Sequence, residues 1–460
     1  MAYLGNIPAE KYQTISSQQI TGNGGSSYSL TYSVSSPEDI AVFVNNVRQN
    51  VNSYSVSLNT LTLGGNISAS DECWVLYLGK TISTVAPANN SVTNDMLVGS
   101  IATSKISNLY PYRNLIINGD MSIAQRGTSA TGLTGTGFAC DRFQFASSGT
   151  IGTYTLSQST TTPDEFAYSL KLDTTTADAS PTGTDNLTIR YKIEGQHLQH
   201  LAFGTSSAKS ITLSFWCRSN KTGNFQVNVR NQDANRMISS VVTISSADTW
   251  EYKTITFAGD TVSGFNNDNG ESLRIEWFLD VGTDWSTGTA PTSWETTSAG
   301  DLGAGVTLAL ADNTANEFYL TGVQLEVGTS ASDFEFLPYD VNLQRCHRYY
   351  WKETSSPNAG GQWTAVGGVS QTNTSRVMMF LPTSMRTIPT SLGTSGTASH
   401  YRIQYRNTGE ICNAVPSFVT ANYDRIQFNL STAASMTVGE YCALRYASAN
   451  TGYLEVDVEL

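Results

Sequence analysis

Two histidines, His197 and His200, are the first residues whose spacing suggests chemistry. They stand three residues apart in the stretch HLQH, a spacing that would place both imidazoles on one turn of a helix. No cysteine or carboxylate stands beside them at the spacing of a metal site, so the sequence favours a surface element. Cys346 and His347 are adjacent in the chain, which does not predict a nucleophile and its base. We therefore expect no catalytic residue, no metal ion and no cofactor.

Phosphate binding and glycoside hydrolysis have little support in the sequence. The stretch Gly22–Gly25 lacks the Lys and the Ser or Thr of a phosphate loop and predicts a turn before a strand. A glycosidase needs two carboxylates about 5–9.5 Å apart in a cleft. Carboxylates are numerous, for example Asp280, Asp284 and Glu295, but no local pattern favours such a pair. The chain is therefore not expected to be an enzyme, although a polysaccharide-cleaving protein stays open as an alternative.

Aromatic residues in polar loops fit sugar binding better, because binding sites combine apolar rings with a few polar groups. Trp285 and Trp294 lie in a loop rich in Gly, Pro and Thr, and Trp363 lies between glycines. The alternative for Trp285 and Trp294 is that each covers the edge of a β-sandwich. Tyr349 to Trp351 form an aromatic run that suits a core or a subunit interface.

The composition indicates a β-protein with an acidic first part. Charged residues make up 14% of the 460 residues, below the roughly 25% of soluble domains. Ser, Thr, Asn and Gly take their place, which suits turns and exposed sheet faces. The net charge of −12 argues against nucleic acid as a partner. Residues 341–460 carry nine Lys and Arg against seven Asp and Glu, a balance of +2, so the first 340 residues carry −14.

The sequence also bears on compartment and redox state. No signal peptide and no apolar run of membrane-spanning length is present, so we expect no secretion and no membrane insertion. The six cysteines form no CxxC pair and are expected to be buried free thiols. A disulfide between Cys412 and Cys442 stays open.

Period-2 alternation of apolar residues, as in YSLTYSV, predicts an all-β chain in four parts. Residues 1–88 should form a small β-domain of five or six strands. Residues 89–111 should form a connector, and residues 112–340 a sandwich or jelly roll of eight or more strands. Residues 341–460 should form a second β-sandwich at the tip. No helix of substantial length is expected.

The connector contains a repeat offset by nine residues. Val92 matches Ile101, and Leu97 matches Ile106. Two apolar positions per nine residues cannot bury themselves in one chain, so we expect these four residues to face copies of the same chain. The alternative is a solvated linker with chance similarity.

Several stretches resemble motifs of bacteriophage tail fibres. NLIINGDMSIAQRGT (Asn114–Thr128), followed by DRFQF (Asp141–Phe145), resembles the start of a jelly-roll domain common in these fibres. LTGVQLEVGTSASDFEF (Leu320–Phe336) looks like the last strand of that domain. LQRCHRYYWK (Leu343–Lys352) and LPTSMRTIPTS (Leu381–Ser391) are similar to segments of the fibres' C-terminal domain, and the ending DVEL fits the type.

The front of the chain resembles fibres of short-tailed phages. Residues 1–80 look like their virion-attachment domain, in which the strand run ends in a VLYLG-like strand, here Val75–Gly79. The repeat at residues 91–106 resembles the short links frequent in phage fibres. The resemblance implies a homotrimer in the virion that joins tail tube, adaptor or nozzle proteins by its N-terminal domain. It also implies binding of host surface polysaccharide or an outer-membrane receptor at the distal end.

We expect the receptor surface at the tip, where loops rich in turns should expose aromatic rings among arginines. The residues expected there are Trp363, Tyr401, Arg402, Tyr405, Arg406, Tyr423 and Arg425. The jelly roll, through Trp285 and Trp294, is a rival location. Two other functions stay open: a fibre that cleaves polysaccharide, and a free, monomeric carbohydrate-binding module.

Overall fold

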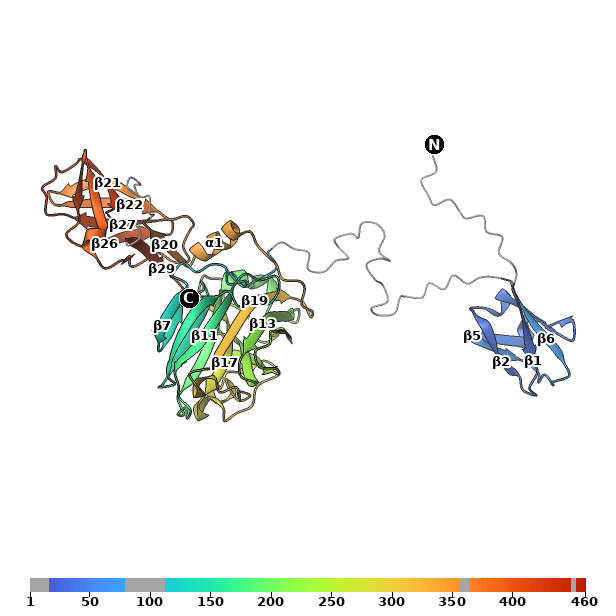
Figure 1. Ribbon diagram of the computed structural model, residues 1–460. Helices are drawn as coiled ribbons and strands as arrows, with labels where there is room; N and C mark the ends of the chain where they lie inside the picture. Colours follow the sequence, from blue (N-terminus) through green and yellow to red (C-terminus); the bar gives the residue numbers. More distant parts are fainter. Residues whose placement is uncertain (1–15, 79–111, 356–363, 448–451) are drawn as a thin grey trace, which may run out of the picture. The chain divides into compact units, whose positions relative to one another are not determined.

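A computed structural model describes residues 16–78, 112–355, 364–447 and 452–460 (Figure 1). The chain forms two compact units, Met1–Ala102 and Thr103–Leu460. The described residues are built almost wholly of antiparallel strands and contain one α-helix, α1 (Tyr339–His347). The expected all-β class is confirmed, and α1 is an addition to it. None of the helices in these residues is long and apolar enough to cross a membrane.

Some of the predictions fall on residues that the structure does not describe. The connector at residues 89–111 lies outside the described residues, with Val92, Leu97, Ile101 and Ile106. Trp363 lies outside them as well. The domain boundaries after residues 88, 111 and 340 stay predictions.

Within residues 16–78, the first unit forms six strands around a small apolar core. They form a four-stranded sheet in the order β1-β6-β3-β4 and a pair β2-β5. Asn45 and Asn46 both have a positive φ and join β3 to β4, as expected for a tight hairpin turn. The strands are β1 (Ser17–Thr21), β2 (Ser27–Val34), β3 (Ile40–Val44), β4 (Val47–Arg48), β5 (Tyr54–Leu63) and β6 (Glu72–Tyr77).

Residues 112–338 of the second unit form a two-sheet β-sandwich, here called the central sandwich. One sheet has six strands in the order β16-β13-β19-β11-β10-β7, and the other has seven in the order β18-β15-β14-β17-β12-β9-β8. Alternate residues of the inner strands, such as Leu213 and Phe215 on β13 and Val227 and Val229 on β14, are fully buried in the core between the sheets.

The strands of the central sandwich have the following bounds: β7 (Ser129–Leu133), β8 (Thr136–Phe138), β9 (Gln144–Ser148), β10 (Thr153–Ser159), β11 (Ser169–Thr176), β12 (Asn186–Glu194), β13 (Ile211–Ser219), β14 (Gly223–Asn231), β15 (Arg236–Ile244), β16 (Glu251–Phe257), β17 (Glu271–Val281), β18 (Glu295–Thr296) and β19 (Glu317–Val327).

The remainder of the second unit, after α1, is a smaller β-structure with its own core, here called the C-terminal sandwich. A seven-stranded sheet has the order β25-β24-β28-β21-β22-β27-β26, and a three-stranded sheet has the order β20-β29-β23. The strands are β20 (Tyr350–Thr354), β21 (Ala365–Gln371), β22 (Thr374–Phe380), β23 (Gly393–Thr394), β24 (Tyr401–Tyr405), β25 (Thr408–Ile411), β26 (Ser417–Asn422), β27 (Arg425–Ser431), β28 (Tyr441–Tyr446) and β29 (Tyr453–Asp457).

All six cysteines are buried and free, as expected. Cys412 and Cys442 form no disulfide. Burial raises the pKa of the Cys412 thiol to about 12, which keeps it protonated and unreactive.

The two sandwiches of the second unit meet at a junction formed by α1 and the residues after β29. The backbone N–H of Asn118 donates to the side-chain oxygen of Asn342 on α1 at 3.1 Å, and the Asn342 amide donates to Asp120 at 3.1 Å. Beside this contact, Ile117 and Ile123 pack with buried residues of the segment that begins with α1. The NLIINGD stretch therefore forms the surface against which α1 packs.

Polar contacts close the other side of the junction. Arg142 forms an ion pair with Glu459, and the ammonium of Lys192 donates to the carbonyl oxygen of Leu460 at 2.5 Å. Arg386 donates to the carbonyl oxygens of Val458 at 2.8 Å and Glu459 at 3.0 Å. The DVEL stretch is thereby held against the central sandwich.

Candidate functional site

A groove with a volume of about 1030 Å³ lies on the outer face of the six-stranded sheet and is here called the aromatic groove. Its floor comes from β13, β16 and β19, and the loop that follows β19 contributes a wall. Along β13, Leu213 and Phe215 point into the core, so Ser214 and Trp216 point outward to the groove. The aromatic residues that line it are Phe166, Trp216, Tyr252, Phe334 and Phe336.

Trp216 and Tyr252 form the open platform of the groove. They are direct partners in the register of β13 and β16, which brings their side chains together on one face. Their ring centroids are 5.2 Å apart at an interplanar angle of 45°. Tyr252 is 45% exposed, so a ligand can reach its ring.

A β-bulge beside the platform makes room for Trp216. The pairing of β13 with β19 shifts register between Ser214 and Trp216, where β19 carries an extra residue. Gly322 lies at this position with φ +60, and a Cβ there would lie 2.8 Å from Phe166 and 3.0 Å from Trp216. Glycine is therefore required both by the backbone and by the two rings packed above it.

Three phenylalanines form the apolar wall. Phe166, Phe334 and Phe336 pack with centroid separations of 4.8–5.2 Å, in edge-on and tilted arrangements. Phe166 is buried, whereas Phe336 is 50% exposed. The exposed rings leave a large apolar surface open beside the platform.

The loop that carries Phe334 and Phe336 is fixed by buried polar groups of β19. Gln324 accepts a hydrogen bond from the Glu335 N–H at 2.9 Å, and Glu326 accepts from the N–H and hydroxyl of Ser332 at 2.8 and 2.7 Å. Arg113 donates to the Ser332 hydroxyl at 2.9 Å. Polar side chains from LTGVQLEVG and from RNLIING thus fix the position of this loop by hydrogen bonds.

Polar groups stand around the rings at the rim of the groove. Thr254 and Ser330 offer exposed hydroxyls, and Glu165 and Asp333 offer exposed carboxylates. Rings with hydroxyl and carboxylate acceptors at their border can stack on the apolar face of a sugar and bond its hydroxyls.

The tryptophans predicted for sugar binding, Trp285 and Trp294, cover edges of the central sandwich. The Trp285 indole donates to the carbonyl of Thr184 at 3.1 Å, and that of Trp294 donates to Ala258 at 2.6 Å. Trp294 also packs edge-on against Phe203, at 5.6 Å between centroids. Their polar atoms are already bonded to the protein, as the edge-covering alternative supposed.

Two tyrosines predicted in exposed loops are buried, and that prediction was wrong. Tyr401 and Tyr405 lie on β24, whose alternation turns them into the core of the C-terminal sandwich. The Tyr401 hydroxyl donates to the carbonyl of Tyr453 at 2.6 Å, and that of Tyr405 accepts from Thr437 at 2.8 Å. Only Tyr423, 43% exposed, is on the surface as expected among these three.

The three arginines predicted beside them do not gather into one patch. Arg402 lies on β24 and Arg425 on β27, and three strands separate these in the sheet order. At about 4.8 Å per strand the two backbones are roughly 19 Å apart. Arg406 pairs with Glu440 at 3.0 Å and Arg425 with Asp424 at 3.5 Å. Whether any of them touches a receptor stays a prediction.

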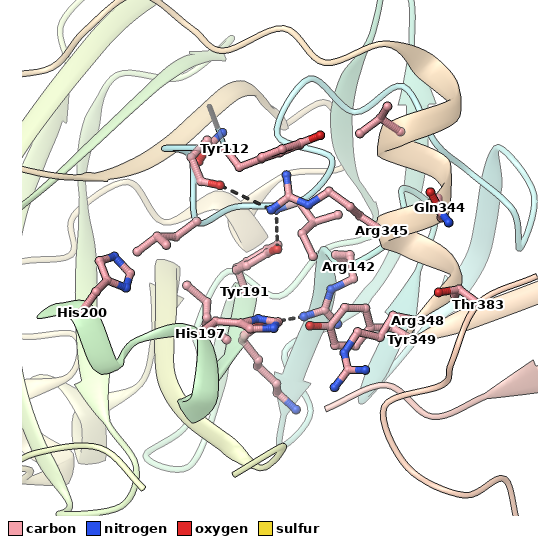
Figure 2. A pocket seen from close by; sticks show the side chains of 16 residues that line it. Tyr112, Arg142, Tyr191, His197, His200, Gln344, Arg345, Arg348, Tyr349 and Thr383 are labelled. Atoms are coloured by element: carbon pink, nitrogen blue, oxygen red, sulfur yellow. Dashed lines mark hydrogen bonds between the residues drawn. The ribbon is translucent and has the colours of Figure 1, made fainter. Parts of the chain in front are cut away.

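The two histidines of HLQH lie in consecutive 3-10 turns, η5 (Gly195–His197) and η6 (Gln199–Leu201). Among the residues that the structure describes, no cluster of three or more metal-ligating side chains occurs. Both histidines instead line a second pocket, which also contains side chains of α1 (Figure 2).

The platform of the aromatic groove was missed by reasoning from the sequence. The pattern ITLSFWC placed Leu213 and Phe215 on one face, so Trp216 had to lie on the other face. A Trp on the outward face of a strand is a signal for a surface with a partner, and Trp216 is half-buried there. That Tyr252 lies opposite Trp216 could not be predicted without the register of β13 with β16.

No protein-family model and no curated protein matches the chain. Similar solved structures include the enzymatically active domain of tailspike protein 4 of bacteriophage CBA120, at 12% identity and a TM-score of 0.28. That match covers 48% of this chain, which spans only 22% of the tailspike chain. Likenesses at this level carry no inference about ligands.

Two further similar structures are carbohydrate-binding modules. TmCBM61, solved with β-1,4-galactotriose, is 8% identical, with 47% of this chain and 99% of the module covered and a TM-score of 0.25. The family 11 module of a Clostridium thermocellum cellulase is 10% identical, with 47% and 96% covered and a TM-score of 0.23.

Proposed function

We propose that this protein is a bacteriophage tail fibre that recognises the host by binding surface polysaccharide in the aromatic groove. The observation that carries the proposal is the paired platform of Trp216 and Tyr252 beside three phenylalanines, with hydroxyls and carboxylates at the rim. Flat rings on the outer face of a sheet, here an exposed Tyr252 and a half-buried Trp216, are pre-organised for stacking on sugars, so little conformational entropy is lost on binding.

The rest of the proposed role is supported by the resemblance of the sequence. The motifs at residues 114–128, 320–336 and 343–352 are similar to those of tail fibres, which are homotrimers. Residues 1–88 would attach the fibre to tail tube, adaptor or nozzle proteins of the virion. An outer-membrane receptor is the other class of host partner that the resemblance allows.

The groove is favoured over the tip as the receptor surface for a physical reason. In the tip, Tyr401 and Tyr405 are buried, the three arginines are dispersed, and Arg406 and Arg425 are paired with carboxylates. In the groove, aromatic and polar side chains converge on one surface. The groove therefore offers the combination of rings and polar groups that a sugar needs, and the described residues of the tip named here do not.

Binding without cleavage is part of the proposal. The two carboxylates at the rim, Glu165 and Asp333, are exposed. The general acid of a glycosidase is commonly a desolvated carboxyl whose pKa is raised by its surroundings. Incubation with host capsule or lipopolysaccharide should therefore release no new reducing ends. Their release, and its loss in a Glu165→Gln or Asp333→Asn variant, would establish the depolymerase alternative.

The location is tested with the full chain and paired variants. Tyr252→Ala and Trp216→Ala should each weaken binding to purified host polysaccharide about two- to twelvefold, since a stacked ring contributes about 0.5–1.5 kcal/mol. The matched control is Tyr423→Ala with Arg425→Ala in the C-terminal sandwich, which should bind like wild type. Loss of binding in the control and not in the groove variants would return the receptor surface to the tip.

A further inference from the structure

A second pocket, here called the junction pocket, opens where α1 packs on the central sandwich (Figure 2). Its volume is about 560 Å³, within the range of roughly 300–1,000 Å³ common for small-molecule sites. The cations that line it are Arg142, Lys192, Arg345 and Arg348, and no carboxylate lines it. His197 and His200 also line it, and burial lowers the pKa of both imidazoles. The pocket is therefore lined by groups that favour an anion.

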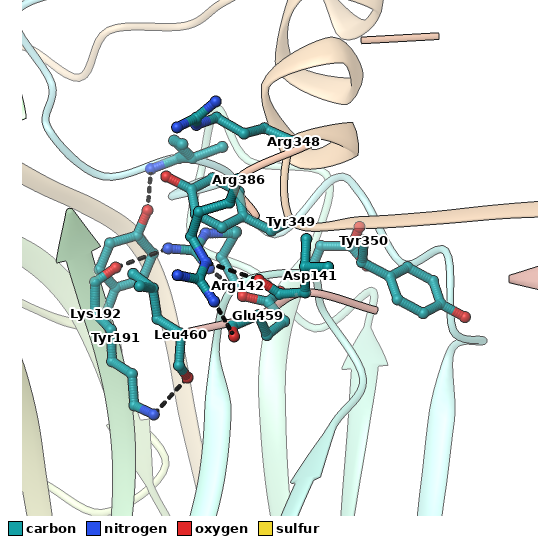
Figure 3. A network of polar contacts seen from close by, with 12 residues as sticks. Asp141, Arg142, Tyr191, Lys192, Arg348, Tyr349, Tyr350, Arg386, Glu459 and Leu460 are labelled. Atoms are coloured by element: carbon teal, nitrogen blue, oxygen red, sulfur yellow. Dashed lines mark hydrogen bonds and ion pairs between the residues drawn. The ribbon is translucent and has the colours of Figure 1, made fainter. Parts of the chain in front are cut away.

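Three of the four cations are already paired with carboxylates of the protein, and Figure 3 shows one of these pairs, Arg142 with Glu459. Arg348 makes two hydrogen bonds, of 2.8 and 2.7 Å, to the buried carboxylate of Glu194. Arg142 pairs with Glu459 and also donates to the carbonyl of Lys192 at 2.7 Å. The ammonium of Lys192 itself lies 3.6 Å from Glu271.

Arg345 differs from these three residues. It forms no ion pair with any residue that the structure describes, and its one hydrogen bond is a long contact of 3.5 Å to the carbonyl of Asn114. Its Nη1 is covered by protein atoms and has no hydrogen-bond partner. Figure 2 shows its guanidinium within the pocket, close to Tyr112 and Tyr191. A guanidinium carries five N–H donors, so most of its capacity is unused.

The hydroxyl group of Tyr191 is an uncharged donor close to the guanidinium of Arg345. Tyr191 lines the pocket, and its hydroxyl oxygen accepts a hydrogen bond from the Ile117 N–H at 2.6 Å. Tyr191 is 1% exposed, and its hydroxyl proton has no acceptor among the residues that the structure describes, so it can donate to a ligand that enters the pocket. A guanidinium with a phenol next to it matches the geometry of an oxyanion, which accepts from several donors at once.

We propose that the junction pocket binds an oxyanion, a carboxylate or phosphate group carried by an acidic sugar, with Arg345 as its principal cation. The sugar ring would lie between the η5–η6 turns and α1 and so contact both the central sandwich and α1. The site is separate from the aromatic groove, and only the expected source of the sugar, a host glycan, rests on the proposed function.

The test is calorimetric titration of the full chain with glucuronate, inorganic phosphate and, as a neutral control, glucose. Wild type should bind at least one of the two anions more weakly as salt rises, and should not bind glucose. Binding of glucuronate alone identifies an acidic sugar, and binding of phosphate alone identifies a phosphate group. Failure of both anions to bind at millimolar concentration overturns the proposal.

Variants locate the site. Arg345→Gln should weaken anion binding at least tenfold and Arg345→Lys less, whereas Arg425→Gln, at an exposed arginine far along the chain, should leave it unchanged. Equal binding by wild type, Arg345→Gln and Arg345→Lys contradicts the proposal. Tyr252→Ala should retain anion binding, so that failure of the junction pocket and failure of the aromatic groove are distinguishable.

Discussion

At the scale of single residues, the aromatic groove depends on Gly322, which has no side chain to contribute. Its positive φ opens the bulge in β19, and its missing Cβ leaves space for Trp216 and Phe166. Gly322 lies beneath the rings that face the ligand, and its backbone conformation and small size therefore determine where those rings lie.

Gly322→Ala should lower the free energy of unfolding by about 1–3 kcal/mol, because the new Cβ strains the backbone and clashes with two rings. Gly132→Ala is the control: Gly132 has φ +66, but a Cβ added there would have no neighbour within 4 Å, so this variant isolates the backbone term. Chemical denaturation measures both. Equal losses in the two variants would show that the rings do not depend on Gly322.

Asp280 provides a test of pH dependence at the residue scale. Burial raises its pKa to about 6, although the N–H groups of Ala311 and Val281 each donate to it at 2.8 Å. The folded state thus holds a proton between about pH 4 and 6 that the unfolded state releases. Stability from this group is fully present below about pH 4 and is lost as pH rises through 6.

Asp280→Asn should remove the pH dependence of the unfolding free energy that comes from Asp280. Between pH 4 and 7, wild type should lose on the order of 3 kcal/mol more unfolding free energy than the variant. Asp164→Asn, at an exposed carboxylate, should keep the wild-type profile. Parallel profiles for wild type and Asp280→Asn would mean that Asp280 is not protonated in this range.

At the scale of elements, the motifs that resemble tail fibres are the parts that build the junction. Residues 114–128 bind α1 through the hydrogen bond between Asn118 and Asn342. Arg113 donates to Ser332 in the segment after β19, and Glu459 near the end of the chain pairs with Arg142. These stretches are far apart in sequence, so no local pattern could predict that they meet. Strand alternation did predict the sandwiches, because burial of one face is a local signal.

The local signal of strand alternation also explains why the prediction that Tyr401 and Tyr405 are exposed was wrong. HYRIQYRN alternates, so its tyrosines had to share a face with Ile403, and the core was the consistent choice. The groove residues Trp216 and Tyr252 could be placed on an outward face by alternation alone. Their pairing needed the register of β13 with β16, which depends on long-range contacts.

The junction can be tested at Arg348 and Glu194. Burial alone would raise the pKa of Glu194, but hydrogen bonds from Arg348 and Tyr349 hold it below its usual value. Arg348→Met should cost about 3–5 kcal/mol, because it leaves a buried carboxylate without its cation. Combined with Glu194→Gln, the loss should be smaller than the sum of the two single losses.

The control for this cycle is Arg406→Met, which breaks a solvent-exposed pair with Glu440 and should therefore change the free energy of unfolding little. Denaturation of the full chain gives all four values. If Arg348→Met costs no more than Arg406→Met, the buried pair is not what fixes α1 to the central sandwich.

At the scale of the whole molecule, the proposed fibre depends on association through the connector. Leu97 and Ile106 are expected to face a three-fold axis, where three copies of a short apolar stripe can bury one another. Changing both to Asp should therefore weaken self-association. Light scattering should find wild type trimeric and the variant shifted toward monomer at micromolar concentration. A monomeric wild type would favour the free-module alternative.

The most direct test of host recognition through the aromatic groove is a crystal structure of the full chain soaked with an oligosaccharide from the host surface. The account predicts a sugar ring stacked on Trp216 or Tyr252, with its hydroxyls bonded to Thr254, Ser330 or Asp333. An oligosaccharide bound only on the C-terminal sandwich, with the aromatic groove empty, would contradict it.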